Sequence, residues 1–176
     1  LCLGNGEGSG GCVGFEQPQP GRFEVSLDVD HIDFDILNPL LPELLVMEGG
    51  VRAQGRFQVE GNVLSGSARV EVPTGKINMA LGEDQGRDVL VFSGTGLDVE
   101  AGRGGLDARL NLFVTDLGGV RAAVSLPGFR LDSGAGQALR GDVSVSLDGL
   151  SRISNLLPDV TDITGNIDGD LQLAGT

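Results

Sequence analysis

The stretch VRAQGRFQVE, residues 51–60, decides the fold class. Its odd-numbered residues are apolar or glycine, whereas its even-numbered residues are arginine, glutamine or glutamate. Successive side chains of a β-strand point to opposite faces of the sheet. The alternation therefore predicts a strand with one apolar face and one polar face.

The same alternation recurs along most of the chain. It is clear at 22–29, 106–115, 120–126, 143–147 and 163–173, and weaker at 64–72, 76–81, 88–92 and 97–101. The pattern predicts about ten strands. Short turn-like connections, such as 60–62, 73–75 and 102–105, join antiparallel neighbours, because parallel strands need a crossover of about a dozen residues. We expect an all-β fold with long antiparallel strands in a curved, meandering sheet.

Two apolar segments interrupt this pattern. The first is 33–46, where prolines limit any helix to short turns, and the second is 150–158. The residues at helical spacing are Phe34, Leu37, Leu41, Leu44 and Leu45 in the first segment and Leu150, Ile153 and Leu157 in the second. One or two short helices are expected. Both segments contain Leu-Leu-Pro, which suggests an internal repeat near 25–62 and 143–176; chance similarity is the alternative.

Composition narrows the possible functions. The 176 residues include 12 Lys plus Arg against 25 Asp plus Glu, a formal charge of −13. Nucleic acids and anionic membrane surfaces would be repelled by this charge. No run approaches the roughly 18 consecutive apolar residues of a membrane-spanning helix. The chain begins at Leu1 without a signal-peptide pattern, so we expect a fragment of a longer protein.

The two cysteines lie in a glycine-rich N-terminal segment, 1–21, which we separate from a single elongated β-domain, 22–176. The flexible stretch between Cys2 and Cys12 suits a local disulfide in an oxidising compartment. Two free surface thiols are the alternative. A metal site would need more soft ligands than this segment offers.

No catalytic, cofactor or metal site is expected. Acidic residues surround the sole histidine, His31, but no nucleophile motif accompanies it. Asp168 and Asp170 echo a calcium loop that lacks its terminal glutamate. We interpret these residues, together with Asp28, Asp30, Asp33 and Asp35, as solvated outer surface. An enzyme is the least favoured hypothesis.

Several motifs resemble the TamB family of the AsmA-like superfamily. They are the pairs at 2–3 and 12–13, the strand 23–29, ILNPLLP at 36–42, the strand 50–61 and the closing segment ITGNIDGDLQLAGT at 163–176. The resemblance implies the periplasmic part of an inner-membrane-anchored protein of a Gram-negative bacterium, with a taco-like sheet around an apolar groove. It further implies transport of phospholipid towards the outer membrane, and assembly of outer-membrane proteins with the barrel subunit TamA.

The residues alone leave two interpretations of the apolar face: a lipid groove or the interior of a β-sandwich. The family resemblance favours the groove, whose aliphatic lining suits acyl chains. The candidate lining residues are Val25, Leu27, Phe57, Val59, Val70, Val72, Leu110, Leu112, Val114, Val124, Leu126, Val143, Val145, Leu147, Leu171 and Leu173. The rival hypothesis is a structural module that binds the barrel partner or its substrates by β-augmentation. Exposed sheet edges would also favour self-association.

Overall fold

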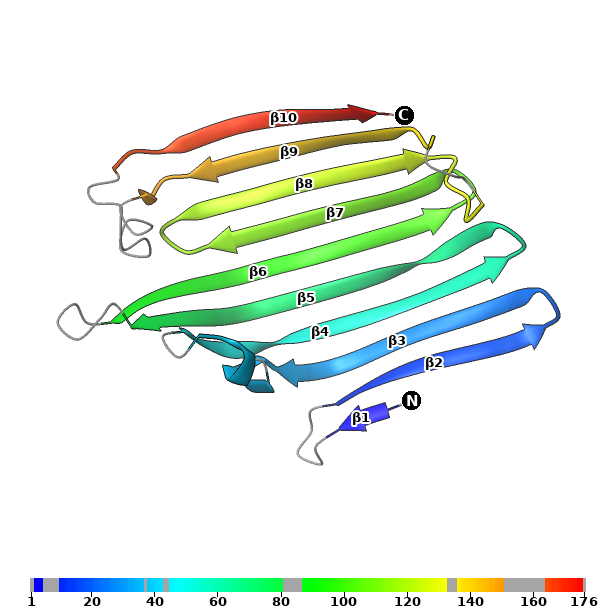
Figure 1. Cartoon of the computed structure of the whole chain (residues 1–176), viewed down its shortest axis with the longest axis horizontal. Coiled ribbons are helices and arrows are strands. Elements are labelled where there is room, and N and C mark those ends of the chain that lie inside the picture. The colour runs from blue at the N-terminus through cyan, green and yellow to red at the C-terminus, as the bar shows by residue number, and fades with distance from the viewer. Residues whose placement is uncertain are drawn as a thin grey trace.

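The structure, a computed structural model, describes residues 2–4, 10–36, 38–42, 45–80, 87–132, 136–150 and 164–175. They form one ten-stranded antiparallel sheet in which every strand pairs with its neighbours in the sequence (Figure 1). The strands are β1 (Cys2–Gly4), β2 (Gly10–Gln19), β3 (Arg22–Asp33), β4 (Leu45–Glu60), β5 (Val63–Ala80), β6 (Arg87–Gly102), β7 (Gly105–Val114), β8 (Gly118–Pro127), β9 (Leu139–Leu147) and β10 (Ile167–Gly175). The all-β, antiparallel prediction is confirmed.

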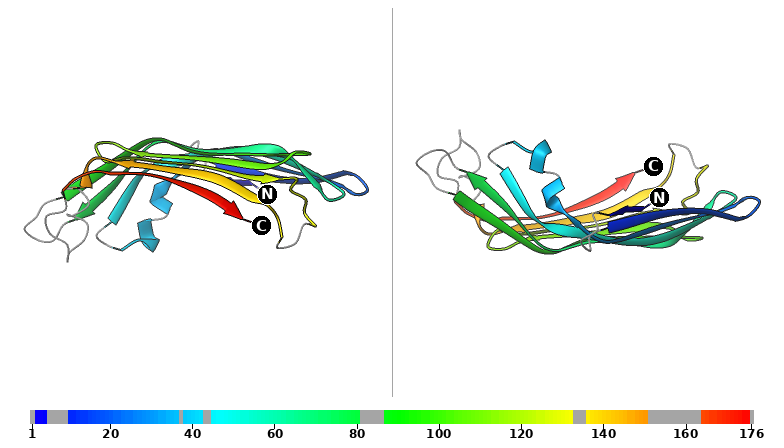
Figure 2. Two further views of the ribbon diagram at one scale, coloured as in Figure 1. Left: turned by 90° about the horizontal axis from the view of Figure 1, so that it is seen from above. Right: turned by 90° about the horizontal axis from the view of Figure 1, so that it is seen from below.

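The sheet is curved and open rather than closed into a barrel (Figure 2). Two short 3-10 helices, η1 (Phe34–Ile36) and η2 (Asn38–Leu40), connect β3 to β4. We call η1 and η2 together the cap; it lies on the concave side of the sheet (Figure 2). The expectation of one or two short helices is thus met, although Leu45 and Val46 belong to β4 and not to a helix.

Two parts of the helix prediction lie outside the described residues: Leu37 and Leu44 in the first segment, and 151–158 in the second. Strand β10 begins at Ile167, and residue 163 of the expected strand is likewise not described. The proposed repeat stays a prediction. Its first copy has the order strand, cap, strand.

The longest strands correct two of the expected boundaries. Segments 64–72 and 76–81 were expected to be separate strands joined by a turn at 73–75, but β5 runs without interruption through that turn. Segments 88–92 and 97–101 are likewise parts of β6. The predicted turn is wrong because a β-bulge, in which one strand carries an extra residue, disturbs the alternation as a chain break would.

The bulges form a row across the sheet. Between paired residues, β3 has one residue more than β4 at 29–32, β5 one more than β4 at 71–75, and β6 one more than β7 at 92–96. Strands β5 and β6 keep a constant mutual register because both carry the extra residue at the same level. Bulges bend strands and increase their twist. The row therefore contributes to the curvature of the sheet.

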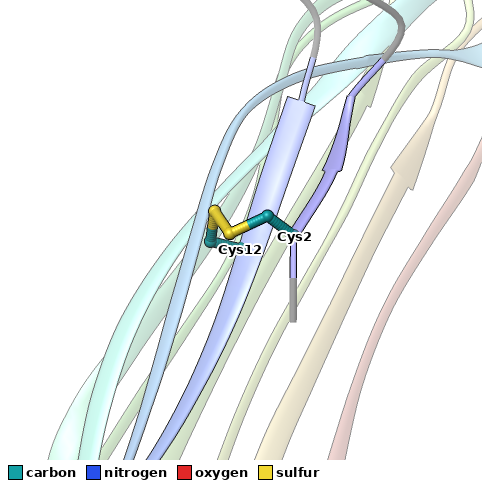
Figure 3. Close-up of a disulfide and its surroundings, with 2 residues drawn as sticks. All are labelled: Cys2 and Cys12. Atoms are coloured by element: carbon teal, nitrogen blue, oxygen red, sulfur yellow. A yellow bond between two sulfur atoms is a disulfide. The ribbon is translucent and has the colours of Figure 1, made fainter.

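The N-terminal segment belongs to the same sheet. Strand β2 pairs with β3, and β1 pairs with the start of β2. A disulfide joins Cys2 to Cys12, which are direct partners across β1 and β2 (Figure 3). The division of the chain at residue 21 stays a prediction, with paired strands on both sides of it.

A substitution at Gly66 can test how closely β4 and β5 approach each other. It has a φ of 136°, and a Cβ at this position would collide with the backbone oxygen of Arg56. Gly66→Ala is expected to lower the free energy of unfolding in urea by about 1–3 kcal/mol. The control is Gly102→Ala, because nothing lies within 4 Å of an added Cβ there. Equal effects of the two substitutions would contradict this packing.

The disulfide offers a second test. Strand β1 has only three residues, so we expect it to leave β2 when Cys2 and Cys12 are both replaced by serine. A cross-link that closes so short a loop contributes about 3 kcal/mol. Hydrogen exchange should accelerate at residues 10–12 and stay unchanged in β5 and β6. Unchanged protection at 10–12 would show that β1 pairs without the cross-link.

Candidate functional site

The strand register builds a continuous apolar surface across the sheet. Directly paired residues of antiparallel strands lie on the same face, so each set of partners forms a row from strand to strand. One row, from β2 to β10, is Gly11, Val29, Ala53, Val70, Leu97, Leu110, Ala122, Val143 and Leu171. The next row is Val13, Leu27, Gly55, Ala68, Val99, Ala108, Val124, Gly141 and Leu173.

A third row extends the surface towards the β2–β3 hairpin. It consists of Phe15, Val25, Phe57, Gly66, Ala101, Leu106 and Leu126. All three rows consist of apolar residues and glycine. We call the surface formed by these rows and their same-face neighbours the apolar face.

All sixteen candidate lining residues lie on the apolar face. Ten of them belong to the three rows. The other six are same-face neighbours, and they are Val59, Val72, Leu112, Val114, Val145 and Leu147. Whether these side chains bind lipid stays a prediction.

The apolar face is the concave side of the sheet. Phe92 pairs with Val114, which alternates with Leu110 and Leu112 along β7. The ring of Phe34, in η1, packs against Phe92 with a centroid distance of 6.3 Å and a tilt of 49°. Since η1 lies on the concave side (Figure 2), the side chains of the apolar face point into the concavity.

Much of the apolar face is open to solvent. Leu110 is 38 % exposed, Leu171 62 % and Phe15 68 %. None of the described side chains is fully buried, and the most buried hydrophobic residues among them are Val29, Phe34, Ala53, Phe92, Leu117 and Leu150. A second sheet would bury these leucines, so the sandwich interpretation does not fit the described residues. Contiguous exposed apolar surface of this kind marks binding sites for ligands, membranes or proteins.

The opposite face is polar, with charges of alternating sign. One of its rows is Asp28, Gln54, Arg69, Asp98, Arg109, Ala123 and Asp142. The Nε of Arg69 donates a hydrogen bond of 2.5 Å to Asp98. This bond is the main reason that the pKa of Asp98 is lowered and the pKa of Arg69 is raised. Both groups are solvated, so their pairing favours the register without forming a buried site.

Hollows on this face are lined largely by polar residues. One hollow of about 500 Å³ is lined by Val29, Asp30, Arg52, Ala53, Gln54, Arg69 and Glu71. His31 lies near Asp33, with 2.7 Å between Nε2 and Oδ1, and both side chains are partly exposed. Among the described residues, no three His, Cys, Asp or Glu side chains are arranged to hold a metal ion. The described helices are also too short to cross a membrane.

The apolar face includes residues that were not among the predicted lining residues. Val13 and Phe15 alternate with polar residues or glycine and join the rows through β2, but the glycine-rich segment around them obscured this signal. Leu90 and Phe92 were placed in a weak strand and not among the lining candidates. Along β6, the residues on the apolar face are even-numbered up to Phe92 and odd-numbered from Thr95 onwards, because the bulge lies between them.

Comparison with known proteins identifies the family. A family model described as TamB, N-terminal domain, matches residues 15–176. Neither the curated proteins nor the solved structures gave a match. The matched range begins within β2 and includes all of β3 to β10, and hence nearly all of the apolar face. The chain therefore belongs to the TamB family, as part of the family's N-terminal domain.

Proposed function

We propose that the apolar face binds the acyl chains of phospholipids, and that the chain is a segment of a lipid conduit across the periplasm towards the outer membrane. The TamB family is one of transport and assembly modules rather than of enzymes. The observation that carries the proposal is the set of rows in which only apolar residues and glycine follow one another across the sheet.

The chemistry of these rows suits acyl chains that must move. Each buried methylene contributes about 0.8 kcal/mol without preferring a direction. A pocket that fixes one ligand has convergent polar groups at defined positions, and the three rows have no polar side chain. An acyl chain would therefore meet similar binding energies on successive strands. This property is needed for passage across the sheet.

Two further expectations follow from the family. The proposed location is the periplasm of a Gram-negative bacterium, where an oxidising environment would maintain the Cys2–Cys12 disulfide. The proposed partner is the outer-membrane barrel subunit TamA, with assembly of outer-membrane proteins as the shared task. The polar face, with its paired Arg69 and Asp98, is suited to contact with water.

Adjacent residues on opposite faces of β7 test the lipid proposal. The protein is purified gently from a Gram-negative host, and bound phospholipid is measured by mass spectrometry. Leu110→Asp places a charge among acyl chains and is expected to reduce the phospholipid bound per protein by about tenfold. Asn111→Asp adds the same charge to the polar face and should leave binding unchanged.

Phospholipid bound to the wild-type protein is the first test of the proposed function. If it co-purifies without phospholipid and takes none up from vesicles, the proposed function is wrong. Equal loss of lipid from both variants, with their folding confirmed by circular dichroism, would also contradict binding on the apolar face.

The second candidate function, β-augmentation, is favoured by the β10 strand. All nine residues of β10 are exposed, and within the described part of the chain only β9 pairs with it. An unpaired strand edge is a template for a further strand from a partner or from a second copy. We include TamA, its substrates and a second copy of this chain among the proposed partners of this edge.

Sedimentation velocity tests the self-association. The average mass should rise with protein concentration, because pairing at β10 would satisfy backbone hydrogen-bonding groups in a second molecule. A charged or proline substitution at Leu171 should reduce the association. A monomer throughout a wide concentration range would show that the β10 edge does not pair with itself.

A further inference from the structure

The apolar face is interrupted by two aromatic rings, Phe34 from η1 and Phe92 from β6. Both side chains are only 8 % exposed, and their rings pack against each other. We call this pair the aromatic wall. On the side of the wall nearer to the β2–β3 hairpin, the apolar face contains Leu110 and Leu112, which are 38 % and 39 % exposed. The wall therefore stands at one end of an open part of the face.

The ring of Phe92 lies over a glycine of the neighbouring strand β5. Gly75 is the direct partner of Phe92 on β5, and a Cβ at Gly75 would collide with the Phe92 ring. Gly49 is in turn the partner of Gly75 on β4. The missing side chain at Gly75 leaves the space in which the Phe92 ring lies, whereas a Cβ at Gly49 would collide with the backbone of Thr74 and Gly75.

The cap holds Phe34 in place above Phe92. In η2, the side-chain amide of Asn38 accepts a hydrogen bond of 2.9 Å from the backbone nitrogen of Met47 and donates one of 3.1 Å to its carbonyl oxygen. Strand β3 has already ended at this level, so Asn38 occupies the place of a strand partner along β4. The short cap is thereby anchored beside the sheet, with Phe34 directed onto the apolar face.

The apolar surface continues beyond the wall. Met47, Ile77 and Leu90 are direct partners on β4, β5 and β6, and they lie two residues further along each strand than Gly49, Gly75 and Phe92. Two residues of a strand correspond to about 7 Å. Without the ring of Phe34, the open part of the face would extend by roughly this length, enough for several methylene groups.

We propose that Phe34, held over Phe92 by the cap, forms the end of the acyl-binding surface and sets the longest acyl chain that the surface accommodates. This inference rests on the proposed lipid binding and adds a specificity-determining residue to it. An acyl chain that lies along the strands from the hairpin side buries each further methylene until its end meets the wall. Longer chains leave their additional methylenes in water.

Binding of a series of saturated fatty acids to the purified protein tests this role. Successive members differ by two methylene groups and displace a fluorescent fatty acid. The wild-type affinity should rise by about fourfold per methylene and then level off at one chain length. Phe34→Ala should move this levelling-off to longer chains, by two or more methylene groups. Phe113→Ala is the matched control, because Phe113 pairs with Gly119 and lies on the polar face beside the exposed Asn111.

Two additional variants keep the test decisive. Phe34→Leu retains an apolar side chain in case the alanine variant does not fold, and it should produce a smaller shift in the same direction. Thr95→Phe adds a ring one row before the wall, opposite Val72, and should shift the levelling-off to shorter chains. The Oγ1 of Thr95 is buried without a partner in the described part of the chain, so this substitution removes no hydrogen bond found there.

The possible failures are distinguishable. Absence of fatty-acid binding by the wild-type protein would overturn the proposed lipid function itself. Wild-type binding with the same levelling-off length in the Phe34 variants and in Thr95→Phe would overturn the role of the wall while leaving lipid binding intact. An equal shift in Phe113→Ala would assign the effect to general loosening of the sheet.

Discussion

The apolar face depends on the register of the antiparallel pairs, because the side chains of a strand alternate between the two faces. A slip of one residue between β7 and β8 would place Leu110 opposite Arg121 or Ala123 instead of Ala122, and would turn the apolar set of one strand to the polar side. The alternating charges on the other face oppose such a slip. Arg69 lies between Gln54 and Asp98, and Asp98 lies between Arg69 and Arg109. Apolar and electrostatic contacts therefore favour the same register.

The sheet bends at the row of bulges, yet its apolar face continues across them. An extra residue reverses the odd–even phase of its own strand, and the sequence of each bulged strand changes phase with it. In β3, Val29 and Ile32 on either side of the bulge pair with Ala53 and Val51. Here β5 and β6 both change phase at the same level, so Val72 and Gly75 share a face on β5, as Thr95 and Phe92 do on β6. Strands β4 and β7 continue without an extra residue. The sheet gains a bend, and its two faces remain distinct.

Sequence patterns predicted the fold class, most strand positions and the side of the sheet on which the sixteen candidate lining residues lie. Those predictions needed only the alternation of apolar and polar residues, a pattern that is visible among neighbouring residues. Where a bulge shifts the phase, as at 73–75, local sequence does not distinguish a continuous strand from a turn. Turn residues such as Pro73 and Gly75 favoured the wrong choice. The bulge depends on the pairing of β5 with the neighbouring strands, where Gly75 faces Gly49 and Phe92, and these partners lie outside the local stretch of sequence.

The contact between Phe34 and Phe92 shows a different limit of prediction. Each residue was noticed, Phe34 in an apolar helical pattern and Phe92 at the end of a weak strand, but nothing in their spacing indicates that they meet. Their contact requires the cap to turn back over the sheet, Asn38 to bind the edge of β4, and Gly75 to leave space for a ring.

A single sheet cannot shield its own apolar face, since each layer of a protein normally covers the next. The cap covers only the end of the face at which the aromatic wall stands, while Leu110, Leu112 and Leu171 remain substantially exposed among the described residues. An exposed aliphatic surface of this extent is favourable only if something apolar occupies it. A protein partner would be expected to match bulky anchors with pockets, whereas the row that contains Gly55, Ala68 and Ala108 offers a smooth surface. Flexible acyl chains need no such matching, and this supports the proposal that they occupy these rows.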